Sequence, residues 1–471
     1  MRWRTKALEA AVVLCAGLGL SPATGQDEVA KLLPADGELE DYFGHALAIC
    51  GDTAVIGTQY DDDNGENAGA AYIFHYDGSN WLEQAKLAPA DPAASDLFGC
   101  AVAIDGDVIV VGAEEADDHG VSSGAAYVFR FSHASDTWVQ RAKLLPDDGA
   151  ADNLFGHSVA VSGDVALVAM SGVSGAGDYT GSAYIFRFDQ GQDLWVQEAK
   201  LAVSDGAEAD LFGVSVALDG NTAVIAAPYD DDNGSESGSV YIFAYNGAGW
   251  SQQAKLHASD AAANDFFGCS VDVSGHYLVA GAHWDDDKGE ESGSAYVFHR
   301  DGDTWEQQAK LLAADGAEGD AFGTAVAIED DTILVGVPHD DSSGTSSGSV
   351  YVFYRHCVSW TQVDKLTSSD GEPWDLFGSS AGISGNHGVF GALRNDDAGS
   401  NSGSAYVFDV ACCPGDLDGD DDCDQADLAQ LLGNYGMTGG ACYEDGDLDG
   451  DGDVELGDLA ELLHYYGAVC D

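Results

Sequence analysis

Short apolar runs, separated by glycine, aspartate and asparagine, follow one another along most of this 471-residue chain. In the first unit, residues 43–50 and 53–57 are mainly aliphatic and small, residues 70–76 alternate around aromatic side chains, and residues 81–87 end in a Lys-Leu pair. Apolar runs of this length, closed by turn residues and without a helical period, indicate β-strands. The first unit therefore predicts four short strands.

This four-strand unit repeats seven times. A Phe-Gly pair recurs at intervals of 55 or 57 residues, and a Tyr-aliphatic-Phe triplet and a Lys-Leu pair keep the same intervals. The Phe-Gly pairs begin at Phe43, Phe98, Phe155, Phe212, Phe267, Phe322 and Phe377; the triplets at Tyr72, Tyr127, Tyr184, Tyr241, Tyr296, Tyr351 and Tyr406; and the Lys-Leu pairs at Lys31, Lys86, Lys143, Lys200, Lys255, Lys310 and Lys365. Three motifs in step predict an all-β seven-bladed β-propeller, because a ring of four-stranded blades protects its sheet edges.

The phase of the repeat predicts how the ring closes. A Lys-Leu strand near residues 29–32 precedes the first Phe-Gly pair, and none follows the triplet at Tyr406. The N-terminal strand should therefore be the outer strand of the last blade. We place the propeller at residues 26–410.

The Phe-Gly pairs, the run Val111-Gly112-Ala113 and the segment Gly-Ala-Ala-Tyr-Val-Phe at 124–129 resemble FG-GAP repeats. These repeats build the propeller of integrin alpha chains and occur in many bacterial surface proteins. The resemblance covers about residues 29–410 and implies the fold rather than an activity. Integrin-type repeats that bind calcium hold it in the hairpin between the first two strands. Here that hairpin, residues 50–53, is too short to wrap an ion, so that site does not carry over.

Acidic residues dominate the charge of the chain. It has 82 Asp plus Glu against 17 Lys plus Arg, a formal net charge of −65, which excludes nucleic-acid binding and favours cations or basic partners. Acid runs follow the second strand of most units: Asp61 to Asp63, Asp117-Asp118, Asp230 to Asp232, Asp285 to Asp287, Asp340-Asp341 and Asn395 to Asp397. We expect them at one end of the propeller, where calcium sites, a docking face for a cationic partner and solvated turns all fit their composition.

The seven repeat lysines predict a structural ion pair within each blade. A second acidic set stands two residues before each Phe-Gly pair: Asp41, Asp96, Asn153, Asp210, Asp265, Asp320 and Asp375. These residues are the expected lysine partners.

The first 25 residues have the pattern of a cleaved secretory signal peptide. Arg2, Arg4 and Lys6 precede an apolar stretch at 7–20, and small residues follow at 21–25. A membrane anchor is the alternative, but the apolar stretch is shorter than the roughly 20 residues that a span needs. No other segment is apolar enough to span a membrane. We therefore expect a secreted, extracellular or cell-surface protein.

Cysteine usage agrees with export. Five of the ten cysteines lie in the last 60 residues: Cys412, Cys413, Cys423, Cys442 and Cys470. In an oxidising compartment this cluster predicts a small disulfide-bonded module; a zinc site is the alternative, although no Cys-x-x-Cys motif accompanies it.

The pattern changes at residue 411, and residues 411–471 form a separate module with two acidic loops 31 residues apart. Loop positions 1, 3, 5 and 12 offer side-chain oxygens and position 7 a backbone carbonyl, a donor set that suits Ca²⁺. The predicted ligands are Asp416, Asp418, Asp420, Asp422 and Asp427 in the first loop, and Asp447, Asp449, Asp451, Asp453 and Asp458 in the second.

Each acidic loop leads into a short predicted helix, residues 427–435 and 458–466. Apolar residues recur at helical spacing, and Gly436 and Gly467 end the helices. The paired loop–helix units resemble a type I dockerin, a small α-helical EF-hand-type domain. The resemblance implies calcium binding and attachment through a cohesin to an extracellular scaffold. The Ser-Thr pair that dockerins commonly use for recognition is replaced by Gln425-Ala426 and Leu456-Gly457.

Three functions fit these features. The first is a secreted, non-enzymatic binding or adhesion protein, whose propeller is the interaction face and whose dockerin-like module is the tether to a cohesin-like or envelope scaffold protein or a glycan. The second is a polysaccharide-degrading glycosidase or lyase carried by a dockerin, and the third is a structural envelope component. Breaks in the repeat are few: residues 171–174, His283-Trp284, Trp374 and Arg394. The sequence offers no catalytic or organic-cofactor motif.

Overall fold

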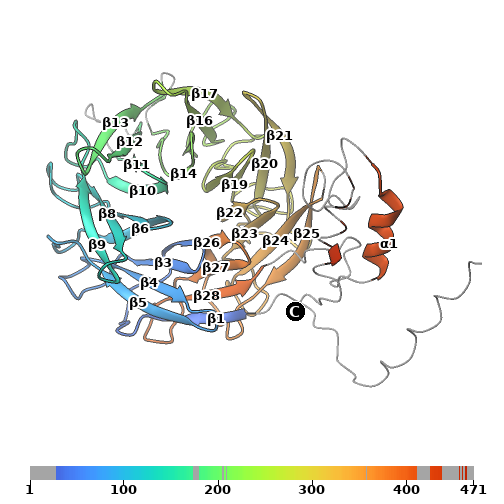
Figure 1. Ribbon diagram of the computed structural model, residues 1–471, viewed down its shortest axis with the longest axis horizontal. Coiled ribbons are helices and arrows are strands. Elements are labelled where there is room, and N and C mark those ends of the chain that lie inside the picture. The colour runs from blue at the N-terminus through green and yellow to red at the C-terminus, as the bar shows by residue number, and fades with distance from the viewer. Residues whose placement is uncertain are drawn as a thin grey trace, which may run out of the picture.

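The computed structural model describes residues 28–172, 180–203, 206–207, 209–356, 358–410 and 425–437, together with residues 454, 456, 459, 462 and 463. Seven four-stranded antiparallel sheets surround a central axis (Figure 1). The predicted seven-bladed β-propeller is therefore confirmed.

The strands follow the same order in every blade, from the central axis outward. The innermost strands are β2 (Ala46–Cys50), β6 (Phe98–Asp105), β10 (Phe155–Ser162), β14 (Val216–Asp219), β18 (Val271–Ser274), β22 (Ala325–Glu329) and β26 (Phe377–Ser384). The second strands are β3 (Thr53–Thr58), β7 (Val108–Ala113), β11 (Val165–Met170), β15 (Thr222–Ala227), β19 (Tyr277–Ala282), β23 (Thr332–Val337) and β27 (His387–Ala392). The third strands are β4 (Ala70–Tyr76), β8 (Ala125–Ser132), β12 (Ser182–Asp189), β16 (Ser239–Tyr245), β20 (Ser294–Asp301), β24 (Ser349–His356) and β28 (Ser404–Asp409). The outer strands are β5 (Trp81–Leu87), β9 (Thr137–Leu144), β13 (Leu194–Leu201), β17 (Trp250–Leu256), β21 (Thr304–Leu311), β25 (Ser359–Leu366) and, for the last blade, β1 (Glu28–Leu32).

The Phe-Gly pair joins each blade to the preceding one. The amide of Phe98 donates to the carbonyl of Ala68 at 3.0 Å, and the equivalent bond recurs at all seven phenylalanines. Gly69, opposite Phe98, has a φ of +80°, and a Cβ there would lie 2.0 Å from the Phe98 carbonyl oxygen. Only glycine therefore allows the two backbones to approach this closely.

The apolar core lies between neighbouring blades. Phe98 is fully buried, and its ring packs edge-to-face against Tyr127 with centroids 5.5 Å apart. The same cluster includes Val55 and Ile73 of the first blade and Val111 of the second. Each blade thus buries its faces against its neighbours, and closure of the ring buries the last remaining faces.

Hydrogen bonds between successive hairpins form a closed ring at one end of the propeller. The hairpins join the first and second strands, and the side chain that ends one first strand accepts a bond from a turn amide of the next blade. The pairs are Cys50 with Gly106, Asp105 with Gly163, Ser162 with Gly220, Asp219 with Gly275, Ser274 with Asp330, Glu329 with Gly385 and Ser384 with Gly51. We call this end the hairpin face. The opposite end, where the second strands finish, is the loop face.

The N-terminal strand closes the ring as predicted. Strand β1 pairs antiparallel with β28, with Lys31 opposite Tyr406 and Leu32 opposite Ala405. Leu32 is buried, and Phe43 forms a bridge to Gly403 of the last blade. The first strand of blade 1, β2, is shorter than the predicted range 43–50, because it begins only at Ala46.

The C-terminal part contributes one described helix, α1 (Gln425–Asn434), close to the predicted range 427–435. Leu431 is buried, whereas Leu432 and Tyr435, which the helical spacing places on the same face, are 52% and 45% exposed. Val454 exchanges backbone hydrogen bonds with Gly436 and Met437. The second predicted helix lies largely outside the described residues.

Other expectations also fall outside the described residues. They are the signal peptide at 1–25 and the cysteine cluster of the C-terminal module. Cys50, Cys100 and Cys269 are free thiols. In the described part of the chain no helix is long and apolar enough to cross a membrane.

Deleting residues 26–35 should destabilise the propeller. The deletion removes β1, uncovers the edge of β28 and takes away buried Leu32, so we expect the free energy of unfolding to fall by about 3–5 kcal/mol in urea titrations. Val29→Ala is the matched control, because Val29 is exposed and its loss should change stability by only about 0.5 kcal/mol. An unchanged cooperative transition after the deletion would contradict closure by β1.

Candidate functional site

Each blade carries an ammonium–carboxylate cluster on the loop face. In the fifth blade, Nζ of Lys310 lies 2.8 Å from Oδ2 of Asp260, 2.9 Å from Oδ2 of Asp285 and 2.6 Å from Oδ2 of Asp287. The same Nζ is 5.1 Å from the ring centroid of Tyr296, whose hydroxyl donates to Asp260 and Asp285 at 2.9 Å. The lysine is thus held by charge-assisted bonds and a cation–π contact.

The cluster recurs around the ring. The other ion pairs join Lys31 to Asp370 and Asp397, Lys86 to Asp36, Asp61 and Asp63, Lys143 to Asp91 and Asp118, Lys200 to Asp148, Lys255 to Asp230 and Asp232, and Lys365 to Asp315 and Asp340. In most clusters one acid comes from the connection that precedes the blade and the others from its own acid run. Both sets therefore lie on the loop face, as expected.

The predicted lysine partner was wrong. Instead of binding lysine, the acid two residues before Phe-Gly caps its own turn: Oδ2 of Asp265 accepts the amide hydrogen of Ala262 at 2.6 Å. Asp41, Asp96, Asp210, Asp320 and Asp375 accept equivalent bonds, as does Asn153 in the third blade. This carboxylate already accepts a hydrogen bond within its own turn. The lysine therefore pairs with other acids, which the sequence spacing did not identify as its partners.

The pKa shifts agree with a structural role for the lysines. Partial burial alone lowers the pKa of Lys310, but its three carboxylate partners outweigh burial and hold it above the ordinary value. Burial raises the pKa of Asp260, and hydrogen bonds from Lys310 and Tyr296 reverse this and hold it below the ordinary value. A lysine that stays protonated at neutral pH serves as a counter-ion rather than as a base or nucleophile.

The carboxylates of the acid runs also accept hydrogen bonds from backbone amides of their own loops. In the fifth blade Oδ1 of Asp285 accepts the amide hydrogen of Asp287 at 3.1 Å, and Oδ1 of Asp286 accepts that of Glu291 at 2.9 Å. Among the described residues no group of three or more His, Cys, Asp or Glu side chains is arranged to hold a metal ion. A bound cation on this rim therefore remains a prediction.

Of the ten predicted calcium ligands, the structure describes Asp427. It lies in the first turn of α1 and is fully buried. The other nine, Asp416, Asp418, Asp420, Asp422, Asp447, Asp449, Asp451, Asp453 and Asp458, lie outside the described residues. Calcium binding by these ten residues therefore stays a prediction.

Residues that differ from blade to blade collect around the loop-face mouth of the central channel. The two positions that directly follow each second strand are Gln59-Tyr60, Glu114-Glu115, Ser171-Gly172, Pro228-Tyr229, His283-Trp284, Pro338-His339 and Leu393-Arg394. We call these positions the mouth ring. These positions lie between the end of the second strand and the acid run of the lysine cluster. The contacts that repeat in every blade therefore do not determine which residue stands there.

One arc of the mouth ring, in the first three blades, is polar and charged. Nδ1 of His157 lies 2.6 Å from Oε2 of Glu114, which comes from the neighbouring blade. Burial lowers the pKa of His45 against the opposing charge of Glu114. The rings of Tyr42 and Tyr60 pack edge-to-face with centroids 5.4 Å apart.

The arc in blades four to six is aromatic. Phe266 is buried between Tyr229 and Trp284, with ring centroids 5.0 Å and 4.7 Å away and both rings nearly perpendicular to it. Burial and the nearby His339 lower the pKa of His283 to about 4, so this imidazole is neutral at pH 7. Its Nδ1 is buried without a hydrogen-bond partner among the described residues.

The arc continues toward the last blade through His339. Burial lowers the pKa of His339, and the positive charge of Arg394 lowers it further. The side of the mouth from blade five to blade seven therefore presents neutral imidazoles, aromatic rings and one guanidinium beside the acidic loops.

The central channel encloses about 440 Å³ between the innermost strands of all seven blades. Most of the residues that line it are aliphatic, but polar atoms make up most of the surface that faces the channel. The carboxylate of Asp272 accepts backbone hydrogens from Val273 and Ile328, both at 2.8 Å, while burial raises its pKa to about 7. These bonds position Asp272 as a structural group within the channel wall.

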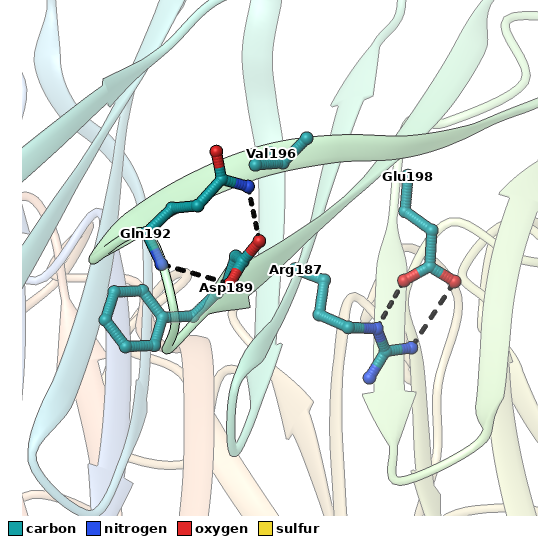
Figure 2. A pocket seen from close by; sticks show the side chains of 6 residues that line it. Arg187, Asp189, Gln192, Val196 and Glu198 are labelled. Atoms are coloured by element: carbon teal, nitrogen blue, oxygen red, sulfur yellow. Dashed lines mark hydrogen bonds and ion pairs between the residues drawn. The ribbon is translucent and has the colours of Figure 1, made fainter.

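A second pocket, of about 320 Å³, lies on the outer edge of the third blade (Figure 2). Arg187 pairs with Glu198, and Gln192 donates to Asp189. The guanidinium also lies 4.9 Å from the ring centroid of Tyr245. The polar groups of this pocket bind one another, which favours a structural role at the edge of the blade.

Comparison with known proteins identifies the family. The FG-GAP repeat model matches residues 27–74, 81–129, 138–186, 195–243, 250–298, 305–353 and 360–408. These segments cover more than half of the chain, which therefore belongs to the FG-GAP repeat family. Such a propeller fits a binding or adhesion role.

Other comparisons add little. No curated protein matches the chain. One solved structure with a similar course is a candidate 6-phosphogluconolactonase from Bacteroides fragilis, 14% identical, with a TM-score of 0.46 over 70% of this chain and 85% of that one. A likeness at this level carries no argument about activity.

Sequence reasoning found part of the mouth ring. It singled out residues 171–174, His283-Trp284 and Arg394 because they break the repeat. It missed Glu114 and Tyr229 of the mouth ring, and the residues that contact or neighbour the ring beside the Phe-Gly pairs, His45, His157 and Phe266. A position-by-position comparison of the seven repeats would have revealed them.

Replacing Lys310 by Met should destabilise the protein more than replacing Lys200 by Met. Lys310→Met leaves the buried carboxylate of Asp285 without its ammonium partner, at a cost of about 3 kcal/mol in chemical denaturation. Lys200 has one described ion pair, with the half-exposed Asp148, so its loss should cost about 1 kcal/mol or less. Equal losses would contradict the cluster as the source of the difference.

Asp265→Asn should stabilise the protein at pH 7. Burial, opposed by the Ala262 amide and reinforced by the charge of Asp285, raises the pKa of Asp265 to about 6, so ionisation above that pH weakens the folded state. Asparagine keeps the turn bond, as Asn153 does in the third blade. We expect a gain of about 1–2 kcal/mol at pH 7 that shrinks toward zero below pH 4, measured by urea titration across that range. A gain independent of pH would contradict this assignment.

Proposed function

We propose that this protein is a secreted, non-enzymatic binding or adhesion protein that recognises its ligand with the loop face of the propeller. The observation that carries the proposal is the mouth ring. The lysine clusters, turn caps and core aromatics repeat from blade to blade and bind one another. The pairs of the mouth ring instead differ from blade to blade, and they include exposed aromatic and charged side chains on the loop face, such as Tyr229, Trp284 and Arg394. Recognition surfaces are commonly built this way, on loops held by a rigid scaffold.

The proposed tether is the C-terminal module. Its two acidic loops have the ligand spacing of calcium sites, and the resemblance to type I dockerins supports attachment to an extracellular protein scaffold. Exposed apolar side chains support a docking role as well. Leu432 is 52% exposed, and Leu456, at the position of the recognition pair, is 70% exposed. At the position that dockerins use for recognition, an apolar side chain would gain free energy when a partner covers it.

A polysaccharide-degrading enzyme is the alternative. The observation in its favour is the His157–Glu114 pair at the mouth, because a carboxylate beside an imidazole can carry a proton to or from a substrate. Glycosidases need two carboxylates at a defined separation, and the buried acids Asp41 and Asp265 already cap turns. Binding without turnover therefore remains the preferred function.

The test compares whole-chain variants for binding to envelope material of the producing organism. Replacing Tyr60, Trp284 and Arg394 together by serine should weaken binding by about tenfold or more, because contact residues of this kind commonly dominate an interface. The matched control replaces Leu194 and Val358 by serine, since both are exposed at the outer-strand hairpins of the opposite face. Equal binding by both variants would exclude the loop face.

The tether is tested in the same assay with calcium or a chelator. Asp427→Ala combined with Asp458→Ala removes position 12 of both loops and should abolish high-affinity calcium uptake in titration calorimetry. It should also reduce retention on the envelope material to the level seen with chelator. Calcium uptake unchanged by this double substitution would contradict the proposed ligand set.

A further inference from the structure

We propose that the aromatic arc formed by Tyr229, Phe266, His283 and Trp284 is a binding site for a neutral glycan chain. The inference rests on the loop face being the recognition surface and adds the class of ligand. The repeat does not require aromatic side chains at these positions, since other blades carry Glu, Gly, His or Arg at the position of Tyr229 and Trp284, and most carry Leu at the position of Phe266.

The geometry of the rings provides a supported platform. Phe266 is only 6% exposed, whereas Tyr229 and Trp284, which both pack against it, are 37% and 40% exposed. Edge-to-face packing on Phe266 restrains both outer rings before any ligand arrives. A restrained ring loses little conformational freedom on binding, which favours affinity.

The local charge selects the ligand class. An anionic ligand would meet the acid runs that flank the arc, including Asp231 and Asp286, on a protein with a net charge of −65. A cationic ligand would find the carboxylates of these runs already bonded, to Lys255 and Lys310 or to backbone amides of their own loops. A neutral ligand with apolar faces and a hydroxyl rim fits both conditions.

Sugar rings have this character. Their axial C–H groups pack on the faces of tryptophan and tyrosine, while their hydroxyl groups exchange hydrogen bonds with carboxylates and neutral imidazoles. The loops beside the platform supply carboxylates, and His283 and His339 supply neutral ring nitrogens. The site is open at the rim, so it suits an extended chain better than a small enclosed sugar.

The experiment is affinity electrophoresis of the whole protein in gels that contain barley β-glucan, xylan, galactomannan or laminarin. We expect retardation in at least one gel. Trp284→Ala and Tyr229→Ala should each weaken that interaction by about tenfold or more. Leu194→Ala is the control, because Leu194 is 57% exposed on the opposite face of the propeller, and it should leave retardation unchanged. Thermal melts of each variant verify that the propeller is intact.

A second arm uses envelope material of the producing organism before and after periodate oxidation, which cleaves vicinal diols in sugars. Loss of binding after oxidation, together with loss in Trp284→Ala, supports the glycan site. Binding that survives oxidation but is lost in Trp284→Ala overturns the glycan assignment and leaves the proposed recognition face intact, for example with a protein ligand. Absence of binding to every probe, or equal binding by Trp284→Ala, overturns the inference, and absence of all binding overturns the proposed function as well.

Discussion

The contact between each Phe-Gly pair and the glycine of the preceding blade determines the rest of this structure. It brings two backbones so close that a Cβ at Gly69 would lie 2.0 Å from a carbonyl oxygen of the next blade, and it places a buried phenylalanine in every interface. Because the core lies between the blades, no blade can bury its faces alone. Stability therefore depends on closing the ring, which β1 completes.

The lysine clusters explain how so acidic a chain tolerates a compact fold. In most clusters the repeat lysine lies among carboxylates both from its own blade and from the preceding connection, so one ammonium offsets repulsion within a blade and also ties two segments together. The tyrosine hydroxyl and ring complete its surroundings. Many of the carboxylates that the composition suggests for ligand binding are therefore already paired within the propeller. The most deeply buried acids are those with partners in the protein.

This division between repeating and non-repeating residues guides the functional interpretation. Where seven blades share a residue, its contacts are with the scaffold. Where they differ, at the mouth ring, the side chains make contacts both within and between blades: Glu114 pairs with His157 of the next blade, and Tyr229 and Trp284 pack against Phe266. A closed ring brings these scattered positions into one surface, and the C-terminal module adds a second, separate means of attachment in the proposed function.

The sequence alone determined the number of blades, the strand order and the closure, because a strict period places the same residues in the same contacts seven times. It also predicted that the acids share one end of the ring. It assigned the wrong acid as the partner of the lysine. The carboxylate of Asp265 already accepts a hydrogen bond from its own turn, and Lys310 instead reaches Asp260 in the preceding connection, and neither contact can be read from sequence spacing. The grouping of Tyr229, Phe266 and Trp284 likewise needed the tertiary structure, because Tyr229 comes from the fourth blade and the packing of that blade against the fifth brings its ring to Phe266.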